Sequence, residues 1–427
     1  MTNIIHFSRF VPVTRLGGGA RRTRQIVELL ESFHPGMVSA GRTAGLQDYT
    51  PADLGFGKGT SLHYYSGKDG KLNYWSTFDL ESACAEGNGN SFPNRSDENV
   101  RVFSSGFQGV RKKKNIDRLW SPDHREKVKR FRTISAEWAH RIDLSQLSLA
   151  LVDDPVYFLP LTGQLKEKGV PVAAVSHNIE SLASHQVKRR CQRDLFNREI
   201  DALKKCDLVI TISREEAWLL ENLDINAFFL PYYPVEEILQ RLLTIRENRQ
   251  KTEKKDFLLI GSTVNDATRQ GMSAVIDKWR ANEWGGEGDR LLVAGYKSDV
   301  FLKDIKRAGA RGRGGLSQQD SIEVLGPLSD EELDKVMSRV RAAIVYQEFG
   351  SGALTRIMET LAAGVPVPVN THAARSYHNL AGVFEFHDLD ELGTVFERIK
   401  KAAGQVPLPS APDPEPVIDA MKKIMKI

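Results

Sequence analysis

Buried strands alternate with amphipathic helices along most of the chain, and this alternation constrains the fold more than any other feature. The stretches LSLALVDD (147–154) and VPVAAVSHN (170–178) are mostly apolar without a period of two, and FLLIGS (257–262) repeats the pattern later. Strands of this kind are typical of parallel sheets that are covered by helices on both faces. The sequence therefore predicts an α/β protein built on doubly wound sheets.

The alternation runs twice, which indicates two domains. A length of 427 residues exceeds one ordinary domain, and a polar, charged segment at 236–255 is interpreted as a connector between the two runs. We predict two Rossmann-like domains, at 1–240 and at 241–427, that face each other across a cleft. Residues 44–115 break the pattern with Gly, Ser and Asn and are interpreted as an irregular insertion with two small strands.

The composition is that of a globular protein that buries real cores, with 41% apolar and 27% charged residues. Its three cysteines, Cys84, Cys191 and Cys206, have no metal-ligand spacing and predict no disulfide framework. No secretory signal or membrane-spanning stretch is visible. We expect a cytoplasmic protein with at most a peripheral contact at the inner face of a membrane.

Basic residues gather in one region although the net charge is only +4. The run Arg111–Lys114 is followed by Lys127, Lys129, Arg130 and Arg132. A solvated face is the favoured interpretation, and contact with an anionic membrane or a phosphorylated acceptor is the alternative. No nucleic-acid-binding module accompanies the charge, so we expect no nucleic acid partner.

The segment RAAIVYQEFGSGALTRIMETLAAGVPVPVN (341–370) carries the most chemical information. A buried strand ends near Tyr346, the turn Gly350-Ser351-Gly352 follows, and a helix begins at about Ala353. The free N–H groups at the start of that helix suit a phosphate. Arg356 and Glu359 share another helix face, as a cation for a diphosphate and a carboxylate for ribose hydroxyls. A solvated ion pair is the alternative.

The same segment resembles the signature of family 4 glycosyltransferases of the GT-B fold. The matching runs are EFGSG and RIMETLAAGVPVPV, and FLLIGS, LLVAG, VLGPLSDEEL and TISREE occur in the expected order. The resemblance covers both domains except the insertion at 44–115, and it implies that 1–240 is the acceptor-side domain and 241–427 the donor-binding domain. It implies a nucleoside diphosphate sugar as donor substrate, no tightly bound cofactor, retention of anomeric configuration and a glycan, lipid-linked or other hydroxyl acceptor. Glu359 matches the carboxylate that holds the donor ribose.

Two departures from the family pattern affect the donor site. Ser351 stands where many members have a first glutamate, while Glu348 lies just upstream and Arg356 fills the basic place of a subgroup. Ser262 and Gln270 occupy the positions of the usual diphosphate-binding Arg and Lys. Arg269 and Arg356 are then expected to share the neutralisation of the diphosphate.

Two features of the first domain match the family as well. His177 follows a strand, where the resemblance implies a histidine that reaches the donor sugar; a structural loop histidine is the alternative. The stretch LGGGARRT implies that Gly18 and Gly19 line the cleft, because glycine lets the backbone approach a ligand closely. It is no dinucleotide fingerprint, because Arg22 replaces the third glycine. Either an arginine of this helix start meets an anion or the first turn is simply solvated.

These features together predict a metal-independent glycosyltransferase. The chain has no Asp-x-Asp segment, and VDDP at 152–155 lies in the wrong half for donor phosphates. Positive charge at the leaving diphosphate would come from Arg269, Arg356 and a helix N-terminus. Three alternatives stay open: a sugar-nucleotide epimerase of similar architecture, a dinucleotide-dependent oxidoreductase and a non-catalytic partner subunit of a glycosyltransferase.

Overall fold

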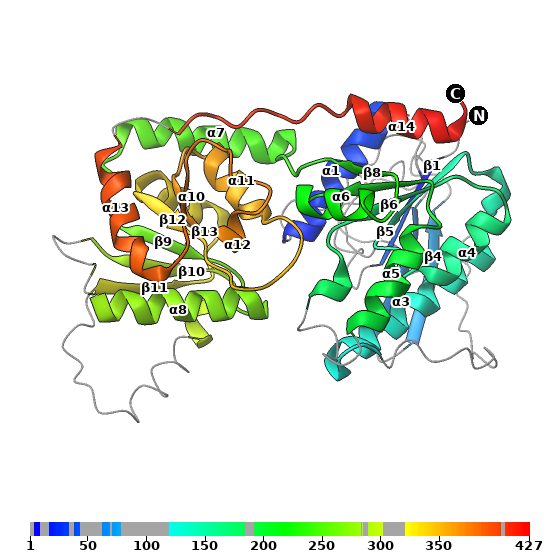
Figure 1. Cartoon of the computed structure of the whole chain (residues 1–427), viewed down its shortest axis with the longest axis horizontal. Helices are drawn as coiled ribbons and strands as arrows, with labels where there is room; N and C mark the ends of the chain where they lie inside the picture. The colour runs from blue at the N-terminus through cyan, green and yellow to red at the C-terminus, as the bar shows by residue number, and fades with distance from the viewer. Residues whose placement is uncertain are drawn as a thin grey trace, which may run out of the picture. The chain divides into compact units, whose positions relative to one another are not determined.

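The chain folds into two compact units in its computed structural model (Figure 1). One unit comprises Met1–Val235 together with Pro412–Ile427, and the other comprises Glu236–Ala411. The sequence analysis assigned the whole carboxyl-terminal segment to the second domain, whereas residues 412–427 pack in the first unit. The structure describes residues 4–8, 17–33, 38–42, 62–68, 71–77, 119–183, 192–282, 284, 289–301, 321–402 and 406–427.

The first unit is built on an eight-stranded sheet in the order β4-β3-β2-β1-β5-β6-β7-β8. All neighbouring strands are parallel except the β3–β4 pair. Strands β1, β5, β6 and β7 are buried at every position, as their continuous apolar sequences predict. The strands are β1 (Ile4–Ser8), β2 (Val38–Arg42), β3 (Leu62–Lys68), β4 (Lys71–Thr77), β5 (Leu149–Asp153), β6 (Val172–Ser176), β7 (Leu208–Thr211) and β8 (Ala227–Phe229).

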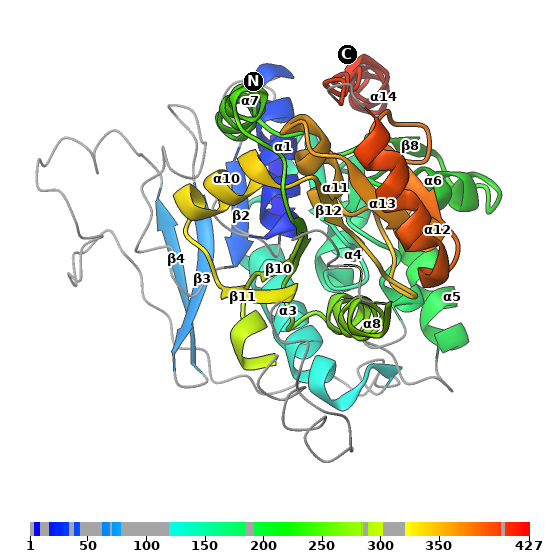
Figure 2. The ribbon, with the colours of Figure 1, turned by 90° about the vertical axis from the view of Figure 1, so that its left-hand side faces the viewer.

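The two small strands predicted within 44–115 are present as the antiparallel hairpin β3–β4 (Figure 2). Strand β3 pairs in parallel with β2, so the hairpin extends the main sheet. The sequence analysis did not assign these strands to the main sheet, because the residues around them lack a strand or helix pattern. The rest of the insertion, Cys84, Cys191 and the run Arg111–Lys114 lie outside the described residues.

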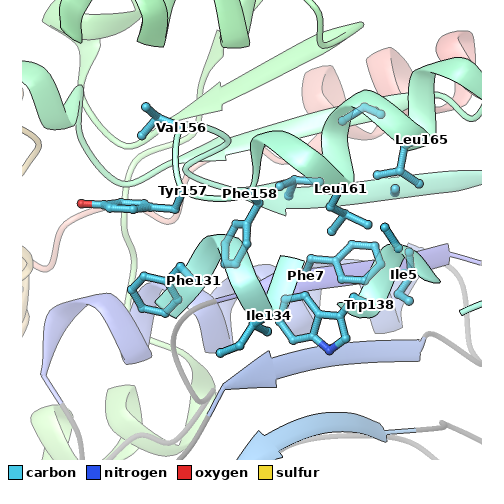
Figure 3. Packing of buried hydrophobic residues seen from close by; sticks show 14 of the residues in the cluster. Ile5, Phe7, Phe131, Ile134, Trp138, Val156, Tyr157, Phe158, Leu161 and Leu165 are labelled. Carbon is cyan, nitrogen blue, oxygen red and sulfur yellow. The ribbon is translucent and has the colours of Figure 1, made fainter. Parts of the chain in front are cut away.

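Helix α3 covers part of the first sheet with an aromatic core (Figure 3). Its Phe131 and Trp138 are buried and pack against Phe7 and Phe158, with ring centroids 5.4–5.8 Å apart. No described helix is long and apolar enough to cross a membrane. The helices of this unit are α1 (Gly18–Phe33), α3 (Pro122–Arg141), α4 (Leu159–Glu167), α5 (Gln192–Leu203), α6 (Arg214–Glu221), α14 (Glu415–Met425), and the 3-10 helices η3 (Leu144–Gln146) and η4 (Glu180–Leu182).

Helix α14 returns to the first unit because its apolar stripe needs a partner. Val417, Ile418 and Met421 recur at helical spacing and are buried in one cluster with Ile26 of α1 and Ile210 of β7. The predicted boundary missed this return because the spacing of a helix shows which face is buried and not which sheet receives it.

The second unit has a four-stranded parallel sheet, β11-β10-β9-β12, and the parallel pair β13–β14. A bridge between Val345 and Val369 connects the two. The strands are β9 (Phe257–Ile260), β10 (Leu291–Ala294), β11 (Ile322–Gly326), β12 (Ala342–Ile344), β13 (Val367–Asn370) and β14 (Val383–Phe386). The helices are α7 (Glu236–Lys251), α8 (Asp266–Asn282), α10 (Asp330–Arg339), α11 (Thr355–Ala362), α12 (Thr371–Ala374), α13 (Leu392–Lys401) and the 3-10 helix η8 (Leu389–Glu391).

The predicted connector at 236–255 is largely helix α7, which belongs to the second unit. Leu242 and Ile245 are buried against α10 and α11, and Arg249 is buried beside them. The segment looks polar because only a narrow apolar stripe faces the core, and because Arg246 and Arg249 donate to backbone carbonyl groups there. The polar composition of 236–255 therefore indicated a connector where the chain forms the packed helix α7.

Two sequence patterns of the capping-box type, Ser329 with Glu332 and Ser213 with Glu216, have different outcomes in the structure. Ser329 and Glu332 form the reciprocal box at the start of α10. Ser213 caps α6 through the Glu216 N–H, but the Glu216 carboxylate accepts from the backbone N–H of Ile179 at 3.0 Å. The second box is thus incomplete, because its glutamate is used to hold a loop after β6.

Candidate functional site

Two groups of polar residues lie at the carboxyl edges of the two sheets, where ligands of doubly wound folds bind. In the second unit, Ser262 follows β9, and the turn Gly350–Gly352 lies between β12 and α11. Gly350 and Gly352 both have positive φ, at 123° and 69°, which explains the glycine requirement of this turn. The residues predicted for the donor site therefore lie on one edge of one sheet.

Arg356 reaches from α11 to the connection between β9 and α8. Its Nη1 lies 3.3 Å from the Thr268 hydroxyl, and a Cβ added at Gly261 would lie 2.9 Å from the same nitrogen. The Nε atom is buried and has no hydrogen-bond partner within the described part of the chain. Burial, and then the charge of Arg375, lower the pKa of Arg356 to about 10. An anion placed here would be stabilised.

Arg375 holds the glycine turn in place, and sequence reasoning missed it. Its guanidinium donates to the carbonyl groups of Ser351 (3.2 Å), Gly352 and His372 (2.6 Å). The His372 Nε2 is buried without a partner among the residues that the structure describes. Burial and the Arg375 charge lower the pKa of this imidazole. No motif indicated either residue, because their roles depend on the return of the chain after β13.

Hydrogen bonds between side chains and backbone join the strand ends around Arg356. The Gln347 side-chain amide donates to the Thr268 hydroxyl at 3.1 Å. Asn370, at the end of β13, accepts from the Gln347 N–H at 3.0 Å and donates to its carbonyl at 2.8 Å. These contacts fix Thr268 and therefore the position of the Arg356 guanidinium.

Arg269 is placed differently from Arg356. Its half-exposed side chain forms an ion pair with Asp266 on the same helix, α8. Gln270 also donates to Asp266, at 3.3 Å. Ser262 is partly buried, and its carbonyl accepts from the Asn265 N–H at 3.2 Å in the turn before α8. The structure therefore brings Arg269 to the same edge as Arg356 with its charge balanced by a neighbour.

The two predicted glutamates also differ in surroundings. Glu348 is exposed and accepts from the Tyr346 hydroxyl at 2.8 Å. Burial, followed by this hydrogen bond and the Glu348 charge, raises the pKa of Tyr346 to about 12. Glu359 is partly buried on α11, one turn after Arg356.

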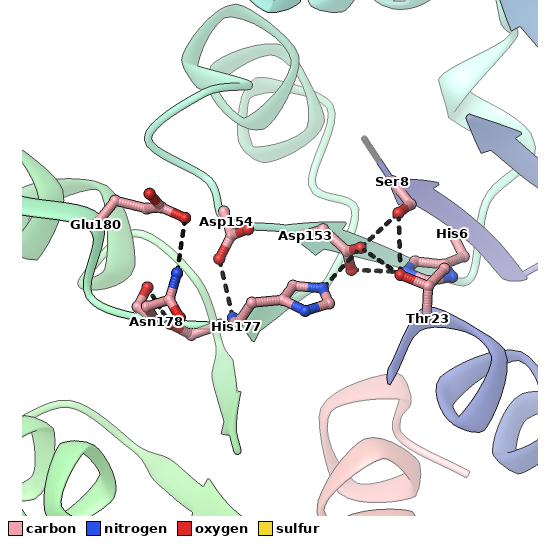
Figure 4. Close-up of polar contacts among 9 residues, drawn as sticks. His6, Ser8, Thr23, Asp153, Asp154, His177, Asn178 and Glu180 are labelled. Carbon is pink, nitrogen blue, oxygen red and sulfur yellow. Dashed lines mark hydrogen bonds and ion pairs between the residues drawn. The ribbon is translucent and has the colours of Figure 1, made fainter. Parts of the chain in front are cut away.

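The first unit has a buried network centred on Asp153, the last residue of β5 (Figure 4). One Asp153 oxygen lies 2.7 Å from His6 Nε2, and the other accepts from Ser8 at 2.6 Å and lies 3.2 Å from His177 Nε2. Thr23 of α1 donates to the same carboxylate at 3.4 Å. Burial opposes ionisation, but the two histidines outweigh it and hold the pKa of Asp153 far below its ordinary 3.8.

Carboxylates also hold the backbone of the loop after His177. The His177 N–H donates to Asp154 at 2.9 Å, and Glu199 accepts from the N–H groups of Glu180 and Ser181, both at 2.8 Å. Burial raises the pKa of Glu199 to about 8 although these hydrogen bonds oppose the shift. This loop therefore has a fixed backbone, which orients His177.

The glycine-rich start of α1 lies at the same edge as His177, since α1 follows β1. Gly18 and Gly19 are partly exposed in the first turn of the helix. Arg22 is fully buried and donates to Gln25 at 2.6 Å and to the Pro231 carbonyl at 3.4 Å. Arg24 forms an ion pair with Glu28 at 2.9 Å. These contacts give Arg22 and Arg24 structural roles.

Sequence reasoning found His177 but missed Asp153 and His6. VDDP was set aside because it lies outside the predicted donor half, and His6 lies in an ordinary strand sequence. A signal was present, since polar residues at the ends of β1, β5 and β6 interrupt apolar strands at one edge. Among the described residues, no group of three or more His, Cys, Asp or Glu side chains has the arrangement of a metal site.

The chain resembles solved structures over its full length. Sucrose-phosphate synthase from Thermosynechococcus elongatus has a TM-score of 0.54 at 14% identity, covering 100% of this chain and 94% of that one. The catalytic domain of starch synthase IV from Arabidopsis thaliana, bound to ADP and acarbose, has 0.56 at 12%, covering 100% and 95%. HepE from Anabaena, in complex with UDP and glucose, has 0.58 at 9%, covering 100% and 95%.

These similarities define the class of fold. The chain has the GT-B architecture of two Rossmann-like domains, and the predicted fold class is confirmed. No protein-family profile matches the chain, and a comparison with curated proteins gave no match either. Identities of 9–14% establish the architecture, and the chemistry has to be argued from the site residues.

Proposed function

We propose that this chain is a glycosyltransferase that moves a sugar from a nucleoside diphosphate sugar to a hydroxyl of a glycan or lipid-linked acceptor, with retention of configuration. The observation that carries this proposal is the Arg356 guanidinium, which has no carboxylate partner within the described residues and lies at the carboxyl edge of its sheet. A cation with a buried, unpartnered nitrogen is stabilised by an anion, and a diphosphate is the anion that suits the adjoining glycine turn and helix start.

The donor nucleotide is proposed to bind along α11 and the glycine turn. Glu359 accepts hydrogen bonds from the ribose hydroxyls, and the backbone N–H groups at Gly350–Gly352 approach the phosphates. Arg356 lies against the diphosphate, and Arg269 exchanges its Asp266 partner for a phosphate oxygen. Ser262 and Glu348 border this site at the ends of β9 and β12.

The first unit is proposed to handle the transferred sugar. His177 donates through Nε2 to the Asp153 carboxylate. Its other ring nitrogen, Nδ1, forms the proposed hydrogen bond to the sugar. Asp153 is a positioning residue in this scheme, because it fixes the ring orientation and tautomer. Gly18 and Gly19 leave space for the acceptor to approach the donor sugar.

Electrostatic stabilisation of the leaving group is the main catalytic contribution. Negative charge grows on the β-phosphate as the bond to the sugar breaks, and the cations of the second unit are already in place at that moment. The acceptor hydroxyl attacks the face that the leaving group occupies, which retains the anomeric configuration. The chain's own cations supply the charge, so the proposed reaction is metal-independent.

One observation favours a second candidate, a non-catalytic partner subunit. Arg269 is paired with Asp266, and Ser262 and Gln270 replace the cations that the family resemblance would place there. If Arg356 alone contacted the diphosphate, the chain would bind a nucleotide but would stabilise the leaving group too weakly for efficient transfer. This candidate differs from the enzyme in one measurable respect, namely acceptor-dependent release of nucleoside diphosphate.

A donor screen tests the proposal. Nucleoside diphosphates and their sugars are compared by thermal shift, and the donors that bind are incubated with candidate glycan and lipid-linked acceptors. We expect mass spectrometry to show a product heavier by one sugar residue and NMR to show the donor's anomeric configuration. Nucleotide binding without a product would support the partner subunit, and donor conversion without an acceptor would support an epimerase.

A further inference from the structure

The second unit contains a cavity of about 360 Å³ at the amino edge of its strands. Arg341 immediately precedes β12 and Pro366 immediately precedes β13, and both line the cavity together with Gly364. The proposed donor site lies at the opposite, carboxyl ends of the same strands. This basal cavity is therefore separate from the donor site.

Positive charge dominates the basal cavity. Four cations line it, Arg249, Lys254, Arg341 and Lys400, and no carboxylate does. The acid shared by this group is Asp289, which lies 3.1 Å from Arg341 and 3.6 Å from Lys400. Lys400 also pairs with the half-exposed Glu397 at 3.2 Å. The lining cations thus exceed the carboxylates that neutralise them.

Helix capping accounts for only part of this charge. Arg249 donates through Nε to the Gly364 carbonyl at 3.1 Å and through Nη1 to the Met337 and Val340 carbonyls at 2.5 and 2.8 Å. These bonds satisfy the carboxyl ends of α10 and α11. The Arg249 Nη2 has no hydrogen-bond partner within the described residues.

Arg341 has still more unused donor capacity. Its Nε donates to Asp289, and its two terminal nitrogens have no partner in the part of the chain that the structure describes. Burial, with the charge of Arg246, lowers the pKa of Arg249 to about 10, and burial with the charge of Arg249 lowers that of Lys254. Burial therefore disfavours the charges of Arg249 and Lys254, and an anion in the cavity would oppose this effect.

We propose that the basal cavity binds a small phosphorylated molecule through Arg341 and Lys400. Guanidinium donors in a planar fork match phosphate oxygens, and an ammonium group adds a point charge. The volume is at the small end of the range for ligand pockets, which suits a ligand of about the size of a sugar phosphate. The non-phosphate part would contact the apolar wall at Pro366 and Ile399.

The test compares phosphate binding by the full chain and by the double variant Arg341→Gln/Lys400→Gln. Arg249 is left unchanged because its loss would uncap two helices. A control variant, Arg280→Gln/Lys401→Gln, removes the same charge from two surface positions of this unit outside the cavity lining. Lys400→Gln alone retains the Arg341–Asp289 pair and provides a variant with a smaller structural change.

Inorganic phosphate is the probe, measured by calorimetry and thermal shift with and without saturating UDP. We expect the wild type and the control to bind phosphate in both conditions, with Tm rising by about 3 °C at ten times Kd. The double variant should bind at least about tenfold more weakly, and Lys400→Gln should lie between the two. Equal binding by all variants, loss of binding with UDP, or no wild-type binding would each overturn the proposal.

Discussion

The carboxyl edges of the two sheets each carry a buried charge of opposite sign, and the two charges differ in how many polar partners they have. In the first unit, the Asp153 carboxylate is fully buried and receives contacts from His6, Ser8 and His177. In the second unit, the Arg356 guanidinium touches one hydroxyl, that of Thr268, and its Nε has no partner among the described residues. The Asp153 carboxylate is balanced by the polar groups around it, whereas the Arg356 guanidinium has no carboxylate partner among the described residues.

If the chain is the proposed glycosyltransferase, this difference would give the two units different roles in transfer. A completed network orients an uncharged ligand by hydrogen bonds without attracting a charge of its own. An incomplete cationic site gains most when a diphosphate arrives and gains further as charge develops on the leaving oxygen. Under the proposed function, the carboxyl edge of the first sheet would contact the sugar and that of the second sheet would bind the nucleotide.

The largest expected effect comes from Asp153→Asn, which removes the carboxylate at the centre of the buried network in the first unit. The amide keeps one acceptor oxygen but removes the negative charge that the two buried histidines share, and the free energy of unfolding should fall by about 3 kcal/mol. Denaturant unfolding of both proteins at neutral pH measures the loss. Ser8→Ala, which removes one donor to the same carboxylate, is the control and should cost about 1 kcal/mol.

The pH dependence of stability tests the same residue. The pKa of Asp153 in the folded state lies far below its ordinary 3.8, so this carboxylate stabilises the fold above that value. Its stabilisation decreases as the pH falls below 3.8, toward the lower folded-state pKa. The wild type should therefore lose stability with acid more steeply than Asp153→Asn, and parallel curves would contradict the assigned pKa.

The next largest effect is expected from Glu359→Ala in the second unit. Two ribose hydroxyls would lose a charged acceptor, which weakens nucleoside diphosphate binding by roughly 1.5–3 kcal/mol. Calorimetry with the nucleoside diphosphate identified by the donor screen gives the value. Glu247→Ala is a matched control, because it removes an exposed carboxylate of α7 that has no part in the proposed donor site. An unchanged affinity in Glu359→Ala would remove Glu359 from the site.

The next prediction concerns Arg356 and Arg269, the two cations of the proposed donor site. Arg356→Ala and Arg269→Ala should each lower the rate constant of transfer by at least about tenfold, or 1.4 kcal/mol, with smaller effects on donor affinity. Single-turnover rates and donor titrations separate the two quantities. Arg280→Ala, on the exposed side of α8, should leave both unchanged. Near-normal transfer in both site variants would favour the partner-subunit candidate.

The smallest expected effect is that of a chelator. If Arg356, Arg269 and the start of α11 supply the positive charge, transfer activity should be the same before and after treatment with EDTA. Activity assays with Mg²⁺ and Mn²⁺ added back complete the measurement. Loss of activity with EDTA and rescue by Mg²⁺ or Mn²⁺ would show that the arginines do not support transfer without a metal ion.

Local sequence patterns predicted the buried strands and the helix that carries Arg356 and Glu359, although they concealed helix α7. Continuous apolar runs such as 149–153 predicted strands covered on both faces, and the Gly-Ser-Gly turn before an amphipathic helix placed Arg356 and Glu359. These inferences succeeded because burial period, glycine conformation and helix spacing are set by residues close together in the chain.

Only the tertiary structure decided which distant residues meet. His6 and Asp153 are 147 residues apart and share a contact because β1 and β5 are neighbours in the sheet. Arg375 holds the turn at Gly352 because the chain returns after β13, and α14 joins the first unit because its stripe fits that sheet. Strand order and helix docking depend on packing summed over the whole core, which no local pattern encodes.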